Sequence, residues 1–250
     1  MPDGTAPRRD GARFAAWLDA QYRSMAAPDM LAEMLTLHFP GRIALVSSFG
    51  AESAVLLHMV AEIDRATPVI FLETGMLFPE TLAYQRTLAA QLGLSDLRLV
   101  RPDATDLRFL DGQGDLHRGN PDGCCHLRKT LPLRRALQGA EASITGRKRA
   151  QGPSRADMPL VEADARSGKL RINPLAAWDR GQITAYMAAH DIPPHPLVAQ
   201  GYPSIGCAPC TSRVGDGEEA RAGRWRGQDK TECGIHFDGT RWIRGPGAGI

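Results

Sequence analysis

Four short segments typical of β-strands, separated by segments long enough for helices, constrain the fold of this 250-residue chain more than any other feature. They cover residues 43–47, 69–72, 97–100 and 142–145. Short apolar runs rich in β-branched residues are typical of buried strands, and strands that alternate with helices build a parallel sheet. The sequence therefore predicts an α/β, Rossmann-like fold. The expected helices cover residues 54–63, 80–92 and 179–190, with two more between residues 14 and 38.

The two ends of the chain differ in composition from its middle. Residues 1–13 carry charges, proline and glycine but no apolar stretch, so we expect a disordered leader rather than a secretory signal. Beyond Pro193 and Pro194 glycine recurs every few residues, as in turn-rich segments. We expect one α/β domain at residues 14–210 and a C-terminal arm at residues 211–250 that lies over the sheet.

Charge and hydropathy disfavour two classes of partner. The formal net charge is only +2, so no overall field favours nucleic acid or a membrane surface. No stretch approaches the roughly 18 apolar residues of a membrane-spanning helix. The chain has five cysteines, and an odd number without a secretory signal favours metal or redox chemistry over a disulfide framework. We therefore expect a cytoplasmic protein that binds neither nucleic acid nor a membrane.

The five cysteines fall into three groups: an adjacent pair, a C-x-x-C unit, and Cys233 alone. Four thiolates can close a metal site, which leaves Cys233 as a separate candidate nucleophile. Adjacent cysteines are unusual for zinc, whose ligand pairs are normally spaced by about two to four residues. Structural zinc and an incidental set of buried cysteines stay open at this point. The candidate metal ligands are Cys124, Cys125, Cys207 and Cys210.

Polar loops follow the predicted strands at the edge where open α/β sheets bind ligands. After the first strand, small and hydroxyl residues let the backbone approach an anion at the start of the next helix, although an ordinary serine-capped turn would look the same. The loop after the second strand suggests a ribose or adenine contact. A basic run after the fourth strand, and two arginines on the arm, suggest sites for phosphate or sulfate, with solvated surface charges as the alternative. The candidate substrate-binding residues are Ser47, Ser48, Phe49, Gly50, Ala51, Glu52, Ser53, Glu73, Thr74, Gly75, Arg147, Lys148, Arg149, Arg221 and Arg224.

These motifs occur together in an order that resembles a known family, the assimilatory sulfonucleotide reductases. Members of this family reduce adenylyl sulfate (APS) or phosphoadenylyl sulfate (PAPS). The resemblance runs from about residue 42 to residue 236, and the cysteine pattern points to the cluster-bearing APS reductases. The segments that resemble the family are residues 47–53, residues 73–81, the Cys124 and Cys125 pair, the Cys207–Cys210 unit and the ending Glu-Cys-Gly-Ile-His at 232–236.

The resemblance implies both a type of sheet and a cofactor. The sheet would be of the PP-loop or adenine-nucleotide-hydrolase-like type, with a nucleotide over its strand ends. The cofactor would be a 4Fe-4S cluster held by Cys124, Cys125, Cys207 and Cys210. Lys129 would couple the cluster to the substrate, since it lies one helical turn beyond Cys125 if this segment is helical.

For the reaction, the resemblance implies a cysteine S-sulfonate intermediate. Cys233 attacks the sulfur of APS and expels AMP, and thioredoxin or glutaredoxin then releases sulfite. Lys230 and the catalytic candidate His236 lie close in sequence and would favour the Cys233 thiolate, whereas Glu232 would disfavour it. The arm must close for the first step and open for the second, so we expect it to be mobile. The expected role is in sulfate assimilation and cysteine biosynthesis, in a homo-oligomer.

Three alternatives stay open. The sequence after Arg224 also resembles PAPS-type tails, and the first loop departs at Phe49 and Ser53 from a common APS-type version, so a PAPS or dual reductase is one alternative. A PP-loop enzyme that uses ATP to thiolate tRNA is a second, but its loop would read Ser-Gly-Gly-x-Asp-Ser where this chain has Phe49-Gly50 and Glu52-Ser53. A non-enzymatic metal-binding or redox-sensing module is the third, and it would leave the fifth cysteine without a role.

Overall fold

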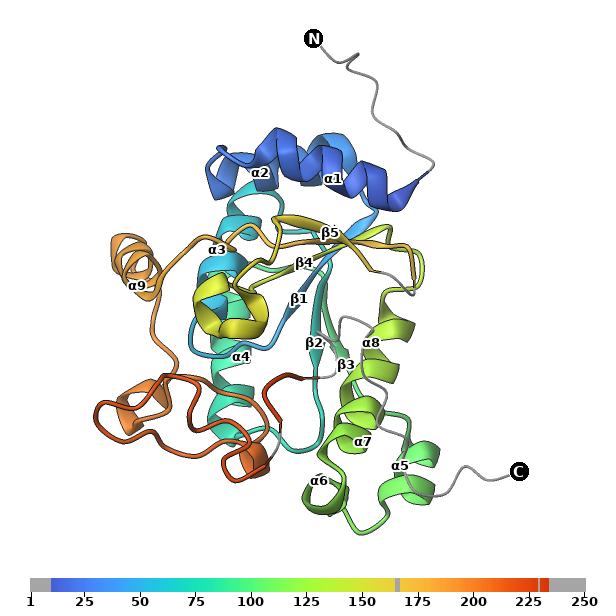
Figure 1. The fold of residues 1–250 in the computed structure, drawn as a ribbon, viewed down its shortest axis with the longest axis vertical. Helices are drawn as coiled ribbons and strands as arrows, with labels where there is room; N and C mark the ends of the chain where they lie inside the picture. The colour runs from blue at the N-terminus through green and yellow to red at the C-terminus, as the bar shows by residue number, and fades with distance from the viewer. Residues whose placement is uncertain (1–9, 165–166, 229, 234–250) are drawn as a thin grey trace.

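The computed structural model describes residues 10–164, 167–228 and 230–233. Within this part a six-stranded sheet forms the centre of the molecule, in the order β3-β2-β1-β4-β6-β5 (Figure 1). Neighbouring strands run parallel except β5, which pairs antiparallel with β6. The predicted α/β fold is therefore confirmed. The strands are β1 (Ile43–Ser47), β2 (Val69–Leu72), β3 (Leu97–Val100), β4 (Ala142–Thr145), β5 (Val161–Ala163) and β6 (Leu170–Ile172).

The first four strands have the bounds predicted from the sequence, whereas β5 and β6 were not predicted. β2 and β4 are buried along their whole length, and β2 is a continuous apolar run. β5 and β6 have three residues each, with Glu162 and Arg171 at their centres. The Arg171 Nη1 and Glu162 Oε1 atoms pair across the two strands at 2.8 Å. Such short strands with a charged centre give no apolar run to detect.

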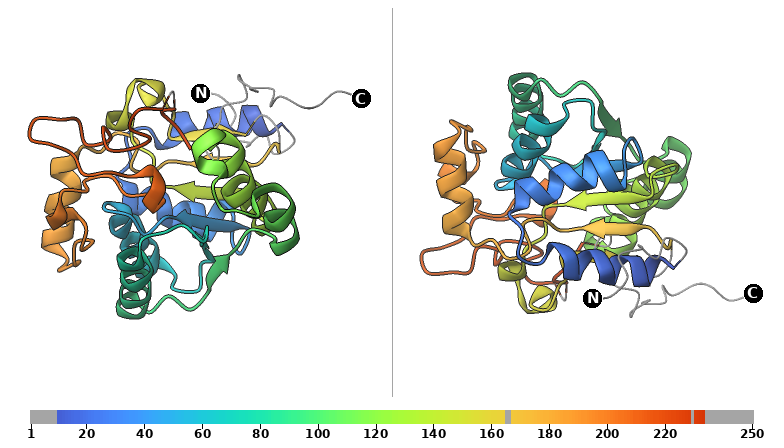
Figure 2. Two further views of the ribbon diagram at one scale, coloured as in Figure 1. Left: turned by 90° about the horizontal axis from the view of Figure 1, so that it is seen from below. Right: turned by 90° about the horizontal axis from the view of Figure 1, so that it is seen from above.

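Helices cover both faces of the sheet (Figures 1 and 2). α3 packs on β1 and contacts α4 and α9, whereas α8 packs on β2 and β3. The strand side chains alternate accordingly: Leu45 and Phe71 lie in the large core, and Ala44 and Ile70 lie in a smaller cluster with residues of α8. The helices are α1 (Gly11–Tyr22), α2 (Ala27–Glu33), α3 (Ser53–Ile63), α4 (Pro79–Leu92), α5 (Ala104–Asp111), α6 (Leu116–Gly119), α7 (Pro121–Cys125), α8 (Leu131–Ala136) and α9 (Arg180–Ala189).

α1 begins earlier than the sequence predicted. The Asp10 side chain accepts hydrogen bonds from the backbone N–H groups of Ala12 and Arg13, so the helix begins at Gly11. That start lies inside the segment 1–13 that was expected to be a leader. Residues 1–9 lie outside the described residues.

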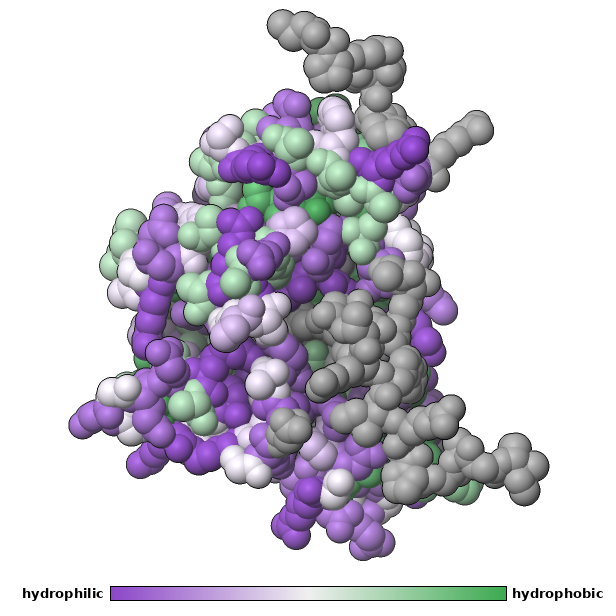
Figure 3. Space-filling model, in the orientation of Figure 1, coloured by the Kyte–Doolittle hydropathy of each residue, from purple (hydrophilic) through white to green (hydrophobic). Residues whose placement is uncertain are grey.

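The described part of the C-terminal arm packs against the ends of the strands (red in Figure 1). Short β-bridges join Leu77 to Cys207 and Thr211 to Arg224. The arm surface is mostly hydrophilic on the face shown in Figure 3, and more apolar residues lie over α1 and α2. Among the described helices, none has the length and apolar character needed to cross a membrane. Residues of the arm and residues at the carboxyl ends of β1 and β4 line the same cavity.

Candidate active site

A cavity of about 970 Å³ opens at the carboxyl ends of β1 and β4. These two strands are neighbours, and the sheet continues from β1 to β2 on one side and from β4 to β6 on the other. Ligands in open α/β sheets bind at such a switch point. The cavity lining includes most of the predicted site residues: Ser47, Ser48, Gly50, Ala51, Glu52, Ser53, Lys129, Arg147, Lys148, Arg149, Arg221, Arg224 and Cys233.

The loop after β1 reaches the cavity through its small residues, and Phe49 anchors it in the core. Phe49 has a left-handed backbone (φ 48°), its side chain is fully buried, and its ring meets Phe71 edge-on with centroids 5.2 Å apart. The Gly50 N–H donates to Ser53 Oγ at 3.1 Å, which closes the turn into α3. Phe49 therefore shapes the loop but does not line the cavity.

The loop after β2 lies beside the cysteines rather than on the cavity. Glu73 pairs with Arg101 at 2.9 Å and accepts a hydrogen bond from the Gly75 N–H at 2.7 Å. Thr74 Oγ1 contacts Cys207 Sγ at 3.3 Å. The structure therefore does not bring Glu73, Thr74 and Gly75, predicted to bind substrate, into the lining with the other candidates.

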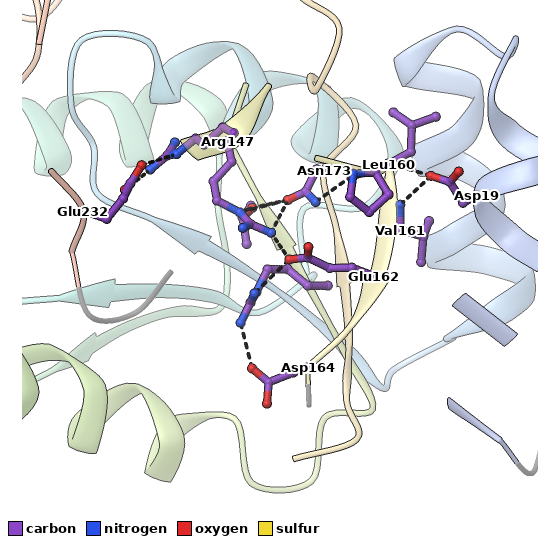
Figure 4. Close-up of polar contacts among 12 residues, drawn as sticks. Asp19, Arg147, Leu160, Val161, Glu162, Asp164, Asn173 and Glu232 are labelled. Atoms are coloured by element: carbon purple, nitrogen blue, oxygen red, sulfur yellow. Dashed lines mark hydrogen bonds and ion pairs between the residues drawn. The ribbon is translucent and has the colours of Figure 1, made fainter. Parts of the chain in front are cut away.

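Two of the three residues of the basic run are already paired. Arg147 is buried after β4, where it pairs with Glu162 and donates to Asn173 Oδ1 at 3.1 Å (Figure 4). Lys148 is also buried and pairs with Glu52 at 2.6 Å. Burial lowers the pKa of both basic groups, against the raising influence of their carboxylate partners. Both side chains therefore help to fix the cavity wall as well as line it.

Arg149 and Arg221 are the more accessible basic groups of the cavity. Arg149 is exposed, and its Nε donates to the Met158 carbonyl at 2.8 Å. Arg221 on the arm donates from Nη2 to the Thr231 carbonyl at 3.0 Å, and burial lowers its pKa. Each of these guanidinium groups has N–H donors beyond the one in its hydrogen bond.

Arg224 and Trp225 separate the large cavity from a second, smaller one, because both residues line both cavities. The Arg224 guanidinium lies 4.4 Å from the centre of the Trp225 ring, within the range of a cation–π contact. Trp225 is buried and has a left-handed backbone (φ 48°). Arg224 Nε and Trp225 Nε1 are buried and have no hydrogen-bond partner in the described part of the chain.

The smaller cavity is the meeting point of the four predicted metal ligands. α7 ends at Cys125 and continues into a π-helical turn, His126–Thr130, which places Lys129 one turn beyond the cysteine pair. Arg128 lies on the same turn and pairs with buried Asp111 at 2.7 Å. No three His, Cys, Asp or Glu side chains in the described ranges are grouped closely enough to hold a metal ion. The thiols that line this cavity are Cys124, Cys125, Cys207 and Cys210.

Cys233 lines the larger cavity and is buried. It clusters with Cys125 and Trp225, and its hydrogen bond to the Cys125 thiol raises the pKa of Cys125 above the usual value. Burial acts to lower the pKa of half-buried Lys129, but the thiols of Cys233 and its neighbours raise it above the usual value. Cys233 and Lys129, both predicted to be catalytic, thus line the same cavity. His236 lies outside the described residues.

Arg155 and Glu232 were not predicted as site residues. Arg155 is buried in the loop after β4, and its Nε and Nη2 donate to the two carboxylate oxygens of Glu232 at 2.7 and 2.5 Å. Burial acts to raise the pKa of Glu232, but the contact with Arg155 holds it below the usual value. Nothing in the sequence links two residues so far apart; the only local signal is the position of Glu232 next to Cys233.

Comparisons with known proteins agree on one family. The family model described as "Phosphoadenosine phosphosulfate reductase domain" matches residues 42–213. An adenosine 5'-phosphosulfate reductase of Mesorhizobium japonicum is 49% identical, over 90% of this chain and 88% of that protein. A phosphoadenosine 5'-phosphosulfate reductase of Gloeobacter violaceus is 42% identical, over 88% of this chain and 92% of that protein.

Solved structures support the same fold. A phosphoadenylyl-sulfate reductase from Candida auris, in a phosphate complex, superposes with a TM-score of 0.69 at 28% identity, over 80% of this chain and 96% of that one. Yeast FAD synthetase in complex with FAD superposes with a TM-score of 0.52 at 16% identity, over 81% and 75% of the two chains, which shows a shared fold alone.

Proposed function

This chain belongs to the phosphoadenosine phosphosulfate reductase family, and we propose that it is an oxidoreductase that reduces APS to sulfite and AMP in sulfate assimilation. Its relatives at about half identity are named APS reductases. The observation that supports this function best is the place of Cys233, a thiol on the wall of a large strand-end cavity beside Lys129 and the arm arginines. Such a place suits a nucleophile that meets an anionic nucleotide.

Substrate binding would use the two sides of the cavity differently. The loop 47–53 offers backbone N–H groups and hydroxyls at the start of an eleven-residue helix, which suits an anionic group. Arg221 and Arg224, which lie on the arm, would bind phosphate or sulfate oxygens, since the paired N–H donors of a guanidinium group match the geometry of such oxygens. Lys129 would add a positive charge close to Cys233. The sulfur would then lie between the arm and the sheet.

The reaction would proceed in two displacements on sulfur. In the first, the Cys233 thiolate attacks the APS sulfur, a new S–S bond forms, and the S–O bond to the phosphate breaks with its electron pair leaving on AMP. In the second, a thiolate of thioredoxin or glutaredoxin attacks the Cys233 sulfur, and sulfite leaves with the electron pair of the S–S bond. The second thiol of the reductant then resolves the mixed disulfide, so the reductant supplies two electrons.

The residues of the cysteine cavity fit an iron–sulfur cluster by their chemistry. Four thiols line one cavity, and Lys129 and Arg128 border the same space. Soft thiolates with nearby cations suit an anionic iron–sulfur centre. Cys124, Cys125, Cys207 and Cys210 would therefore hold the proposed 4Fe-4S cluster. When bound, the cluster would add an electrostatic field beside the reacting thiol.

Reduction of PAPS is the second candidate activity. A relative named phosphoadenosine 5'-phosphosulfate reductase is 42% identical to this chain over most of both lengths. PAPS has an additional phosphate on the ribose, which would require a further positive group. The exposed Arg149 at the cavity is the side chain best placed to meet that requirement.

Sulfite release by anaerobically purified protein tests the proposal. APS and PAPS are compared at matched concentrations, with thioredoxin and with glutaredoxin, and sulfite from APS is expected. Cys233→Ser should abolish release, whereas Arg226→Lys, on the same arm but outside the cavity, should not. Mass spectrometry of the protein with APS alone should find an SO₃ group on Cys233. Release from neither substrate, or consumption of ATP instead, would refute the reductase function.

The cellular setting remains part of the proposal. We expect a cytoplasmic enzyme of cysteine biosynthesis that works as a homo-oligomer. Size-exclusion chromatography with light scattering measures the oligomeric state directly. A mass equal to one 27.1 kDa chain at working concentration would contradict the expected oligomer.

A further inference from the structure

One carboxylate lies inside the anion-binding side of the cavity. Both oxygens of Glu232 accept hydrogen bonds from Arg155, at 2.7 and 2.5 Å (Figure 4 shows the two contacts at Glu232). Ser154 Oγ donates to the same carboxylate at 3.2 Å, and Arg221 Nη2 lies 3.7 Å from it. This arrangement of a guanidinium fork, a hydroxyl and a second arginine is one that phosphate or sulfate would also satisfy.

Glu232 differs from the other carboxylates that line the cavity. Glu52 is paired with Lys148 and belongs to the domain, so it stays in place with the sheet. Glu219 lines the cavity from the exposed arm, and no ion pair is found for it within the described residues. Of these three carboxylates, Glu232 is the one that pairs with arginines of the cavity, Arg155 and Arg221, and it belongs to the arm.

We propose that Glu232 is an internal competitor for the anion site, and that it occupies Arg155 and Arg221 until the phosphate or sulfate of the ligand displaces it. The identity of that ligand rests on the proposed function. Arg155 is buried, and a buried cation without a counter-ion is strongly destabilising, so the free protein needs a carboxylate there. A ligand with more than one negative charge can then replace a single carboxylate. The observed binding free energy is then the difference between the free energy of the ligand's contacts with the arginines and that of the Glu232 contacts it replaces.

Competition of this kind makes Glu232 a selectivity residue. A nucleoside without a phosphate cannot compensate Arg155 and leaves Glu232 in place. A nucleotide must displace the carboxylate before it gains the arginine contacts, so its affinity is reduced by the strength of the ion pair it breaks. Removing the charge of Glu232 should therefore strengthen nucleotide binding and leave nucleoside binding unchanged.

Calorimetric titration of AMP and of adenosine tests this inference. Glu232→Gln keeps the shape of the side chain and removes its charge, and we expect AMP to bind about tenfold more tightly to it than to the wild type, from the worth of a charge-assisted hydrogen bond. Adenosine should bind both proteins equally. Glu219→Gln is the matched control, because it removes a carboxylate from the same cavity without freeing an arginine, and it should change AMP affinity less than about threefold. Glu232→Asp retains the charge on a shorter side chain and should give an intermediate gain.

Two results would overturn the inference. One is AMP affinity that is unchanged or weaker in Glu232→Gln, measured at a temperature where circular dichroism shows that the variant is folded. The other is an equal gain in Glu219→Gln, which would reflect overall charge rather than the Arg155 contact. Inorganic sulfate, followed by the rise in unfolding temperature, repeats the test without a nucleotide. If neither AMP nor adenosine bound but sulfate still discriminated the variants, the proposed function would fail and the inference would stand.

Discussion

Lowering the pH from 7.5 to 5 is expected to reduce the free energy of unfolding by about 2 kcal/mol through one buried histidine, His195. The backbone N–H of Leu197 donates to its Nδ1 at 3.2 Å, and its Nε2 lies 3.0 Å from the Thr81 hydroxyl. Nδ1 must therefore be the acceptor and Nε2 must carry the proton, so both nitrogens of the neutral ring are used. Burial lowers the pKa of His195 from 6.5 to about 4, and Glu80 offsets part of that shift.

The sign and size of the effect follow from that pKa. The unfolded chain takes up a proton near pH 6.5 and the folded protein only near pH 4, so falling pH favours the unfolded state across this window. Each pKa unit is worth about 1.4 kcal/mol, which gives about 3 kcal/mol in full and about 2 kcal/mol by pH 5. The His195 ring contacts Thr81, which lines the large cavity, so its protonation destabilises the fold close to the candidate site.

Urea unfolding at the two pH values measures this contribution. His195→Asn removes the titrating ring, and its side-chain oxygen can still accept from the Leu197 N–H. The wild type should lose about 2 kcal/mol more than the variant between pH 7.5 and 5, whatever other groups titrate in both proteins. An equal loss in the two proteins would refute the reasoning.

Three further perturbations test the packing around the site. Arg128→Met leaves the fully buried carboxylate of Asp111 unpaired and should lower the free energy of unfolding in urea by about 3–5 kcal/mol. Arg98→Met breaks a more exposed pair with Asp96 and should lower it by less than about 1 kcal/mol. Equal losses in the two variants would contradict the role of burial. Phe49→Ala empties a fully buried position and should cost about 3–5 kcal/mol in thermal unfolding, and a loss under about 1 kcal/mol would show that the ring does not anchor its loop. Gly206→Ala places a Cβ against the flexible end of Arg224, so sulfite release should fall with little change in unfolding temperature, and the reverse pattern would argue against a role for that arginine.

The strands at the centre of the sheet could be predicted from the sequence because burial on both faces favours short runs of apolar and β-branched residues. β1 and β2 carry the clearest such signal. α5, α6, α7 and α8 were missed for the opposite reason. α5 has only eight residues and exposes Phe109 and Leu110, and α6 and α7 have only four and five residues, so each is too short to give a distinct helical signal in the sequence. Their signals were local instead: Asp103 caps α5, and Pro121 begins α7.

The sequence could predict which charged residues belong to the candidate site, but not which counter-ions they pair with. The basic run and the arm arginines line one cavity at the strand ends, and their role in binding a ligand stays a prediction. Their counter-ions were not foreseen. Glu162 pairs with Arg147 from a strand that the sequence does not reveal, and Glu52, predicted to bind substrate, pairs with Lys148. A contact between residues far apart in sequence leaves no pattern in either segment.

Those counter-ions explain how a site made for an anionic ligand stays folded without one. A buried cation needs a partner, and Glu162, Glu52 and Glu232 each serve one: Arg147, Lys148 and Arg155. The first two carboxylates belong to the domain and remain when a ligand enters. Glu232 belongs to the arm and precedes Cys233 directly, so on the proposed competition the ligand and the arm compete for Arg155, the one partner of Glu232 that belongs to the domain. An arm without a carboxylate at that place would leave Arg155 uncompensated in the free protein, and an arm bound much more tightly would exclude the ligand from the cavity.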